Sequence, residues 1–448
     1  MIDEVDIVRT EGEMQTLVEA ILQEASRQGA SAAEVSTTRS TGLSVTVRND
    51  SVETVEFDQT GAFAVTVYAG HSKGSARTSD SRAIAIRETV SRALDVARST
   101  RNDPCNGLAE PELMATTVPD VDVFHPAPMD VARAEEVARA CESSGLDYDP
   151  RVTMSEGVSV GNRQSCRVYG NSHGFVGSQT GTLHNLSCQL IAGDSNGVQR
   201  GHWHTIARDA ADLETPEQVG GKAAARVVER LSPGKLATGR YPVLFSAEAA
   251  QSLVGHLINA ISGGSLYRNA SFLLDSLGTA VASEHLSLAE DPLLRKGAGS
   301  GGFDDDGVAT RRKAFIDVGV VRSYALSAYT ARRLGMATTG NAGGVRNLTL
   351  SGRTLPFDDL VAEMGRGLYV TELMGYGVNA VSGDYSQGAA GFWVEDGEIR
   401  HPVHELTIAS NLKDMYRDVV ALGDDLDARS NVRTPSVLIG AMTVAGQG

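Results

Sequence analysis

The sequence predicts an α+β protein. An N-terminal region of antiparallel sheet flanked by helices is followed by a glycine-rich, largely β C-terminal domain with a few helices. The first observation is helical spacing of apolar residues in four segments: 11–28, 81–99, 130–145 and 215–231. The second is apolar–polar alternation between these segments, punctuated by turn-forming dipeptides. The third is a change from Tyr241 onward, where short alternating stretches are separated by glycine-dense loops that allow close backbone approach.

The first unit is expected to combine two helices with a three-stranded meander. Within residues 11–28, one helical face carries apolar side chains, and Gly29 is placed to end the helix. Leu43, Val45 and Val47 then alternate with polar residues before a turn at Asn49-Asp50. We expect the second and third strands at 52–57 and 62–69.

A second unit is expected after a connector rich in Pro, Asp and Asn over residues 101–130. It opens with the helix at 130–145 and closes with the helix at 215–231. Four strands are predicted between them: 151–160, 164–170, 174–192 and 196–207. Ser232-Pro233-Gly234 marks the next boundary. The predicted domains are therefore 1–118, 119–234 packed with the first, and 235–448.

The third unit is read as a curled β domain with a helix at 247–261 and a hairpin at 392–400 that turns on Glu395-Asp396-Gly397. Gly297 to Gly302 reads as a mobile loop, since no Gly-Lys-Ser/Thr follows it and the next residues are acidic. The acidic run Asp304–Asp306 is expected to be a solvated loop, with a divalent cation site as the alternative.

Composition limits the classes of partner. The 448 residues carry 40 basic and 56 acidic side chains, a net charge of −16, so the surface repels nucleic-acid backbones and no nucleic-acid partner is expected. There is no apolar run of about 18 residues, so no membrane partner is expected. The acidic start lacks the features of a secretory signal, and four widely spaced cysteines fit reduced thiols, which predicts a cytoplasmic location.

The segment 251–256 reads Gln-Ser-Leu-Val-Gly-His. A helix of the His-Glu-x-x-x-His kind would hold zinc with two imidazoles and use the carboxylate to take a proton from metal-bound water. Here His256 is present, but Gln251 is a poor zinc ligand and Ser252 cannot act as the base. The segment alone cannot build a hydrolytic zinc site. His256 is then either a structural histidine at the border of the apolar stripe or a residual metal or substrate contact.

A second histidine pair offers a weaker metal candidate. If residues 196–207 form a strand, the side chains of His202 and His204 point to one face, where a third ligand from elsewhere could complete a metal site. An exposed polar strand face gives the same spacing without any metal. We therefore predict no metal site in this chain, with His256, His202 and His204 as the residual candidates.

The C-terminal half resembles the TldD/PmbA family, specifically its PmbA (TldE) branch. The resemblance is carried by six ordered stretches: Gly255–Arg268, Ser271–Gly278, Thr339–Gly344, Val370–Gly375, Gly383–Val394 and Asn411–Met415. The N-terminal half resembles the family mainly in element order. The family implies a cytosolic peptidase of two related subunits, in which the TldD-type subunit carries the His-Glu-x-x-x-His motif and a late metal-binding cysteine. Here the motif is altered at 251–252, and Thr434-Pro435 stands near where that cysteine would fall.

The resemblance implies a non-catalytic subunit that has no catalytic residues and no cofactor of its own, with zinc in a TldD-like partner. An unfolded or extended peptide would be the substrate. Glycine pairs leave backbone groups free for strand addition, so low-ranking contacts to peptide or partner are expected in one set of residues: His256, Gly263, Gly264, Asn341, Gly343, Gly344, Asp384 and Tyr385. Two alternatives stay open: a homodimeric metallopeptidase with an atypical metal site, and a binding module without peptidase partner. The chain could also homodimerise when alone.

Overall fold

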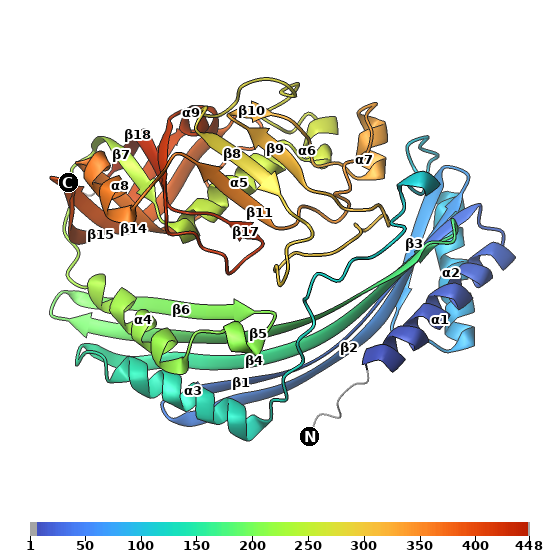
Figure 1. Cartoon of the computed structure of the whole chain (residues 1–448), viewed down its shortest axis with the longest axis horizontal. Coiled ribbons are helices and arrows are strands. Elements are labelled where there is room, and N and C mark those ends of the chain that lie inside the picture. Colours follow the sequence, from blue (N-terminus) through green and yellow to red (C-terminus); the bar gives the residue numbers. More distant parts are fainter. Residues whose placement is uncertain (1–6, 447–448) are drawn as a thin grey trace.

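The N-terminal half is built around one six-stranded antiparallel sheet. A computed structural model describes residues 7–446 (Figure 1). The sheet order is β3-β2-β1-β4-β5-β6. Its strands are β1 (Ala32–Arg48), β2 (Ser51–Ala69), β3 (Ser72–Thr78), β4 (Val152–Asn171), β5 (Val176–Asp194) and β6 (Gly197–Ala207). The stretches 1–118 and 119–234 thus contribute three strands each to a single sheet, joined where β1 pairs with β4.

The strands are longer than the sequence predicts. The stretches 52–57 and 62–69 belong to the single strand β2, and 151–160 and 164–170 belong to β4. Gly161 lies inside β4 and does not end a strand. A Cβ at this position would stand 2.6 Å from Asn185 Oδ1, so glycine is needed here to leave room for that side chain. Likewise, a Cβ on Gly42 would stand 2.8 Å from Asn162 O. These glycines allow close packing inside continuous strands, a second role of strand glycine besides turning.

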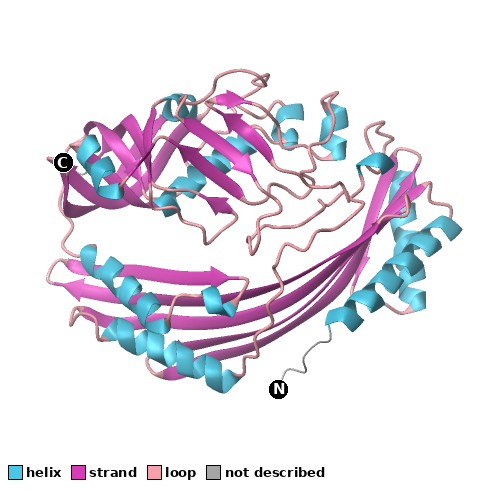
Figure 2. Ribbon diagram, in the orientation of Figure 1, coloured by secondary structure: helices cyan, strands magenta, loops and turns pink. Residues whose placement is uncertain are grey.

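Four helices cover the convex face of the sheet, while the C-terminal domain faces its concave side (Figures 1 and 2). They are α1 (Ile7–Arg27), α2 (Ala83–Ser99), α3 (Val131–Leu146) and α4 (Pro216–Glu229). The two helical pairs bury separate apolar clusters, one around Val18 and Val90 and one around Val45 and Ala138. The start of α4 is fixed by a capping box, in which Thr215 accepts from Gln218 N and the Gln218 side chain accepts from Thr215 N.

The C-terminal domain contains a closed ring of strands and a second sheet. Seven strands run β12-β16-β18-β15-β14-β13-β7, and pairing of β18 with β7 closes a five-stranded barrel of β7, β13, β14, β15 and β18. The strands are β7 (Gly239–Phe245), β12 (Thr354–Leu355), β13 (Gly367–Met374), β14 (Asp384–Glu395), β15 (Glu398–Asn411), β16 (Val419–Gly423) and β18 (Val437–Ala445). The other sheet is β10-β9-β8-β11-β17, formed by β8 (Leu286–Glu290), β9 (Lys313–Asp317), β10 (Val320–Val321), β11 (Leu348–Gly352) and β17 (Val432–Arg433).

Five helices complete this domain: α5 (Ala247–Ala260), α6 (Gly263–Tyr267), α7 (Ala328–Arg333), α8 (Phe357–Met364) and α9 (Leu412–Arg417). The predicted α+β class, with a largely β C-terminal domain, is confirmed. The predicted hairpin is also present, since Glu395 pairs with Glu398 across Asp396 and Gly397, both at positive φ. None of the helices within residues 7–446 has the length and apolar character needed to cross a membrane.

The glycine loop and the acidic run differ from expectation. Gly297, Gly301 and Gly302 are buried, and Gly299 N donates to Asn347 Oδ1 at 2.8 Å, so the loop is anchored to the C-terminal domain. The acidic run is not a solvated loop, because Asp304 is 0% exposed. Its carboxylate accepts from three backbone N–H groups, those of residues 306, 308 and 342, which replace water around the charge.

The acidic run lies beside a carboxylate of the sheet. Glu34 of β1 accepts hydrogen bonds from the hydroxyls of Tyr68 and Tyr169, both at 3.0 Å. Burial raises the pKa of Glu34, and the charge of Asp306 adds to this, although Lys73 at 3.9 Å acts the other way. Burial and the charge of Asp306 raise the pKa of Asp304 to about 7. We call these groups (Glu34, Tyr68, Tyr169, Asp304 and Asp306) the Glu34 junction.

Candidate functional site

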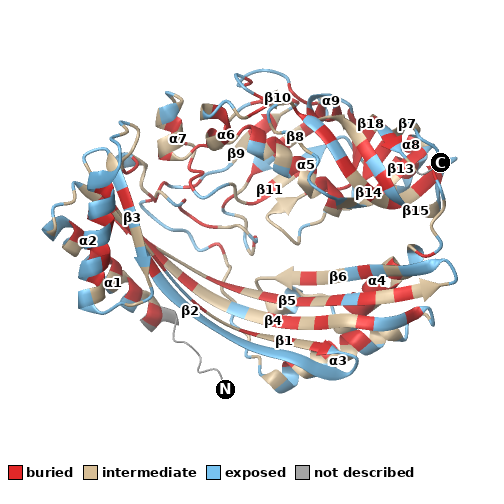
Figure 3. Cartoon of the chain, turned by 180° about the vertical axis from the view of Figure 1, so that it is seen from behind, coloured by how far each residue is buried: buried red, intermediate tan, exposed pale blue. Residues whose placement is uncertain are grey.

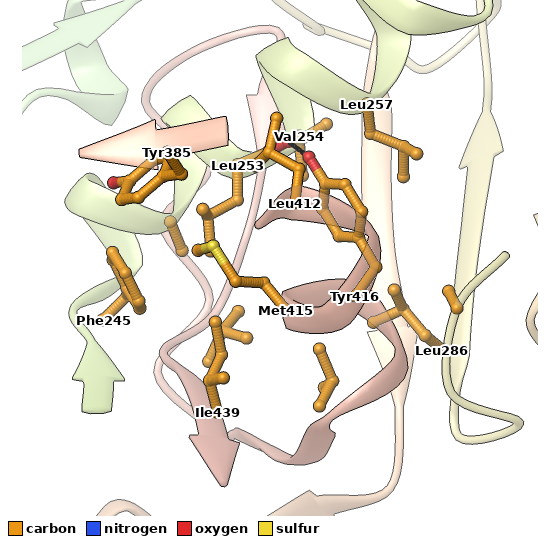
Figure 4. Close-up of a cluster of buried hydrophobic side chains, with 14 of the residues drawn as sticks. Phe245, Leu253, Val254, Leu257, Leu286, Tyr385, Leu412, Met415, Tyr416 and Ile439 are labelled. Carbon is orange, nitrogen blue, oxygen red and sulfur yellow. Dashed lines mark hydrogen bonds between the residues drawn. The ribbon is translucent and has the colours of Figure 1, made fainter. Parts of the chain in front are cut away.

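The helix α5, which carries the altered motif, is held rigidly by one apolar face. Ser246 caps its start by accepting from Ala249 N at 3.2 Å. Leu253, Val254 and Leu257 lie in the largest buried cluster, between the barrel and the second sheet (Figure 4). Tyr416 of α9 donates from its hydroxyl to Leu253 O at 2.7 Å. The opposite face of the helix, with the motif positions, is therefore presented in a fixed orientation.

The first motif positions are occupied by neutral groups whose hydrogen bonds are made within the chain. Gln251 Nε2 donates to Asp427 Oδ2 at 3.2 Å, and Gln251 Oε1 accepts from Ser430 Oγ at 3.1 Å. Ser252 Oγ donates to Ala249 O at 2.7 Å. Thr434, predicted near the position of the late cysteine, does lie at this helix, donating to Ala247 O at 2.7 Å.

These residues do not fit a zinc ion. A zinc site needs three or four nitrogen, sulfur or carboxylate ligands, and Gln251 and Ser252 offer an amide and a hydroxyl already engaged. Over residues 7–446, no group of three or more His, Cys, Asp and Glu side chains is placed to hold a metal. His256 makes no hydrogen bond to a described residue, and burial lowers the pKa of its imidazole. At neutral pH its ring is therefore uncharged.

The histidines of β6 lie apart from the motif helix in the chain. Both point to the face expected from strand alternation, with His202 exposed and His204 half-buried. Burial lowers the pKa of His204, and the neighbouring charge of Arg429 lowers it further. The backbone carbonyl of His204 accepts from Arg429 Nη1 at 3.1 Å, so this residue takes part in a junction with the C-terminal domain.

That junction was not foreseen from the sequence. The Trp203 ring lies between two guanidinium groups, with Arg226 Cζ at 4.2 Å and Arg429 Cζ at 4.0 Å from its centroid. Glu248, in the first turn of α5, accepts from both arginines at 2.7 Å. We call Trp203, Arg226, Glu248, Asp427 and Arg429 the Trp203 junction. They line a cavity of about 360 Å³ between the sheet and the start of the motif helix.

The carboxylates of the Trp203 junction are held in the ionised form. Burial acts to raise the pKa of Glu248, but Arg226 and Arg429 outweigh it, so the pKa lies below its ordinary value. The same balance, with hydrogen bonds from Arg429, lowers the pKa of Asp427. Arg429 Nη2 reaches Asp427 Oδ2 at 2.7 Å. Asp427 also accepts a hydrogen bond from Gln251, which connects the altered motif directly to this network of ion pairs.

One predicted contact residue, Tyr385, lies beside the His256 ring, and a second, Asp384, is next to it in β14. Tyr385 packs edge-on against His256, with 6.2 Å between ring centroids. Tyr385 is 1% exposed, its hydroxyl has no hydrogen-bond partner among the described residues, and burial raises its pKa. Asp384 is exposed, and hydrogen bonds from Ser382 and Asn411 lower its pKa. Together with residues 377–380, Asp384 and Tyr385 line an open hollow of about 560 Å³.

Two of the four predicted glycines, Gly263 and Gly343, serve close packing. Gly263 opens α6, where a Cβ would stand 2.3 Å from Thr330 Oγ1. Gly264 has more room, because the nearest atom to its Cβ would be Arg268 Nη2 at 3.3 Å. Gly343 has φ +81°, and a Cβ there would meet Asp305 Oδ2 at 2.2 Å, whereas Gly344, with φ +112°, faces open space. The backbone of Gly344 is nevertheless engaged, because its N–H donates to Asn341 O at 3.1 Å and its carbonyl accepts from Asn341 Nδ2 at 3.3 Å.

Asn341 is buried and hydrogen-bonds to several polar side chains. It is 5% exposed, its amide nitrogen donates to both carboxylate oxygens of Glu290 at 2.9 and 3.2 Å, and its amide oxygen accepts from Lys313 Nζ at 3.1 Å. Its polar atoms are engaged in holding the loop. The structure thus brings His256 and Tyr385 together, with Asp384 next to Tyr385 at the open hollow, while Asn341 belongs to a separate polar cluster.

Three domain models of one protein family match this chain. Models of the PmbA/TldA metallopeptidase domains match residues 33–97 (domain 1), 124–231 (central domain) and 238–446 (C-terminal domain). The chain is 48% identical to metalloprotease PmbA of Escherichia coli O157:H7 over 93% of this chain and 92% of that one. It is 42% identical to a PmbA homologue of Haemophilus influenzae over 97% of both.

Solved structures agree in fold. A Bacteroides thetaiotaomicron protein described as a candidate modulator of DNA gyrase aligns with a TM-score of 0.92 and 27% identity, over 97% of this chain and 99% of that one. TldE of Thermococcus kodakarensis aligns with a TM-score of 0.80 over 96% and 100%, and at 19% identity it supports the fold alone. With all three domain models matched and near half of the residues shared with a full-length relative, the chain belongs to the PmbA/TldD family of metallopeptidases.

Proposed function

We propose that this chain is the non-catalytic subunit of a two-chain zinc metallopeptidase, assembled with a family member that retains the His-Glu-x-x-x-His motif. One observation carries the proposal: the first metal-ligand position is Gln251, and its amide is engaged by Asp427 and Ser430. With Ser252 in place of the carboxylate, the motif position has no group that can take a proton from a metal-bound water, and Glu248 of the same helix is paired with Arg226 and Arg429. Zinc and the general base would come from the partner.

The contribution of this chain would be part of the surface that holds the substrate. The open hollow is lined by residues 377–380 and by the start of β14, where Tyr385 packs against His256. Main-chain hydrogen bonds at the end of a strand, of the kind used in strand addition, are the proposed way in which an extended peptide binds here. Unfolded or precursor peptides are therefore the proposed substrates. All four cysteines are free, which fits the reducing cytoplasm as the proposed location.

The test is a reconstitution assay with a fluorogenic unstructured peptide. The full-length chain, the motif-bearing family member from the same genome, and their mixture are each assayed with zinc and with a chelator. We expect cleavage by the mixture and none by this chain alone. A partner with glutamine in place of its motif glutamate should inactivate the mixture. The mixture with this partner variant still contains the unaltered chain. Zinc-dependent cleavage by that mixture would therefore show that this chain supplies a catalytic site.

Two other outcomes identify the alternatives. Zinc-dependent cleavage by this chain alone, lost in His256→Ala, would show a homodimeric peptidase with an atypical site. A partner whose activity is the same with and without this chain would show a binding module outside the peptidase. His285→Ala, at an exposed position outside α5, is the matched control for His256→Ala.

A further inference from the structure

The outer edge of β2 is bare over twelve residues. β2 pairs with β1 along its whole length, but on its other side β3 reaches only Phe63–Ala69. Residues 51–62 therefore have a strand on one side only within the described part of the chain. All twelve are exposed, which Figure 3 shows as a continuous pale-blue band. A long edge of this kind is a template for a strand of another chain.

This edge has an apolar face. Val52, Val55 and Phe57 lie opposite Val47, Val45 and Leu43 of β1, which are buried under α3. They therefore extend the buried face of the sheet beyond the helices. Their exposures are 37%, 39% and 62%. Three apolar side chains in a row at the end of a core indicate a contact surface rather than scattered surface residues.

The other face of the same edge is acidic. Glu56 and Asp58 lie opposite Ser44 and Gly42, on the concave side of the sheet. Asp58 has Arg163 at 3.7 Å, between half-exposed side chains, an arrangement that compensates little of its charge. A strand added here would meet apolar side chains on one face and carboxylates on the other.

The opposite edge of the sheet is protected. On β6, the carbonyl of Arg200 accepts from Arg230 Nη1 at 3.2 Å, and that of His204 accepts from Arg429 Nη1 at 3.1 Å. Two outward backbone acceptors are thus satisfied within the chain, and Trp203 is covered by cations. The sheet closes one edge and leaves the other available, which is the arrangement expected where one edge has an external partner.

A second copy of this chain does not suit the edge. Residues directly opposite in an antiparallel pair share a face. The register that places Phe57 opposite Phe57 of a second copy also places Glu56 opposite Asp58, twice. The register that places Phe57 opposite Val55 places Glu56 opposite Glu56. Like charges directly opposite are destabilising, so each register that buries Phe57 against an apolar side chain brings carboxylates together.

We propose that residues 51–62 pair with an edge strand of the partner subunit. That strand carries apolar side chains on its convex face and Lys or Arg on its concave face. This inference rests on the function proposed above. A folded partner is favoured over an extended peptide because covering Phe57 needs a layer of side chains behind the added strand, which a single peptide strand lacks.

The test uses three full-length variants of this chain with the motif-bearing family member. Phe57→Asp removes the apolar anchor, and Glu56→Lys reverses the charge that the partner strand would meet. Ile84→Asp is the matched control, because Ile84 is 60% exposed on α2, away from this edge. Dissociation constants are measured by sedimentation, and hydrogen exchange reports the amides of residues 51–62.

We expect Phe57→Asp to weaken the complex at least about tenfold, as for a central apolar anchor. Glu56→Lys should weaken it less and reduce its salt dependence. Ile84→Asp should bind as the wild type does, all thermal midpoints should agree, and the edge amides should be protected only in the complex. These results would support the proposal.

Other results would overturn it in distinguishable ways. If the wild type forms an active complex and Phe57→Asp associates equally well, the edge assignment is wrong and the proposed function stands. If the wild-type chain and the partner do not associate, both are wrong. Self-association of the wild type that Phe57→Asp abolishes would make a second copy the occupant, contrary to the assignment.

Discussion

The sheet meets the C-terminal domain at two junctions of opposite electrostatic character. At the Trp203 junction, Glu248 and Asp427 face arginines, and the pKa of each carboxyl is lowered despite burial. At the Glu34 junction, carboxylates outnumber cations, and the pKa values of Glu34, Asp304 and Asp306 are raised, first of all by burial. One domain interface thus combines a charge-paired contact with a contact that favours protonated acids.

This difference gives the two junctions opposite pH dependence. A carboxyl with a lowered folded-state pKa contributes stability above its unfolded value, 4.5 for Glu248, and loses it as the pH falls. A carboxyl with a raised pKa contributes fully below its unfolded value, 3.8 for Asp304, and loses that contribution as the pH rises through about 7. The Trp203 junction weakens in acid, and the Glu34 junction weakens toward neutral pH.

The largest expected effect comes from breaking the Trp203 junction. Arg429→Ala should lower the free energy of unfolding by about 3 kcal/mol at pH 7, because it leaves two largely buried carboxylates without their shared cation. The side chains of Asp427 and Arg429 are 7% and 15% exposed, so water screens them little. Urea unfolding measures the change.

Arg322→Ala is the matched control, because Arg322 pairs with Asp317 at 3.4 Å where both side chains are about half exposed. It should cost well under about 1 kcal/mol. Equal losses for Arg429→Ala and Arg322→Ala would mean that burial at the Trp203 junction adds nothing. That result would remove the distinction between the junctions.

The pH dependence of stability is the second way to separate the junctions. In Glu34→Gln, the amide can still accept from one tyrosine hydroxyl and donate to the other, while the titrating group is gone. We expect wild-type stability to decline from about pH 4.5 toward neutral more steeply than that of Glu34→Gln. Urea unfolding across this range measures both slopes.

At acid pH, where Glu34 of the wild type is protonated, the two proteins should converge in stability. Glu19→Gln, at an exposed position on α1, serves as the control and should keep the wild-type slope. A wild type and a Glu34→Gln variant with parallel pH profiles would contradict a raised pKa at Glu34.

These junctions also show what the sequence could and could not predict. The altered motif was readable because its residues share one helix, and Tyr385 entered as a candidate through the family resemblance. The Trp203 junction was not readable, because Trp203, Arg226 and Arg429 come from three distant segments that meet only in the folded protein.

The local sequence pattern gave wrong predictions of burial and of strand ends where contacts with distant segments decide them. The acidic run at Asp304 looked solvated, since the N–H of Ala342 that helps bury it comes from another loop. Gly161 lies in the break predicted between strands 151–160 and 164–170, but its role is to leave room for the Asn185 side chain of the adjacent strand. The fold class was nevertheless predicted correctly, because the periodicity of helices and strands is a local property of the sequence. Strand length and burial depend instead on residues that are distant in the sequence.

The smallest effect on stability is expected at Tyr385, which belongs to neither junction. Its hydroxyl is buried and has no hydrogen-bond partner within residues 7–446, so Tyr385→Phe removes an unsatisfied polar group and should change the free energy of unfolding by less than about 1 kcal/mol. If that hydroxyl is held for a substrate carbonyl in the open hollow, the assembled peptidase should show a higher KM with Tyr385→Phe and an unchanged kcat.

Tyr416→Phe is the matched control for this tyrosine, because the Tyr416 hydroxyl donates to Leu253 O inside the core. It should reduce stability by about 1 kcal/mol and leave the KM of the folded complex unchanged. An equal KM for Tyr385→Phe and the wild type would leave the buried hydroxyl without a role in substrate binding. The hollow would then contact peptide only through its other lining residues, 377–380, Asp384 and Ser386, and the KM of substrates shortened by two residues at a time would show which part of the peptide lies there.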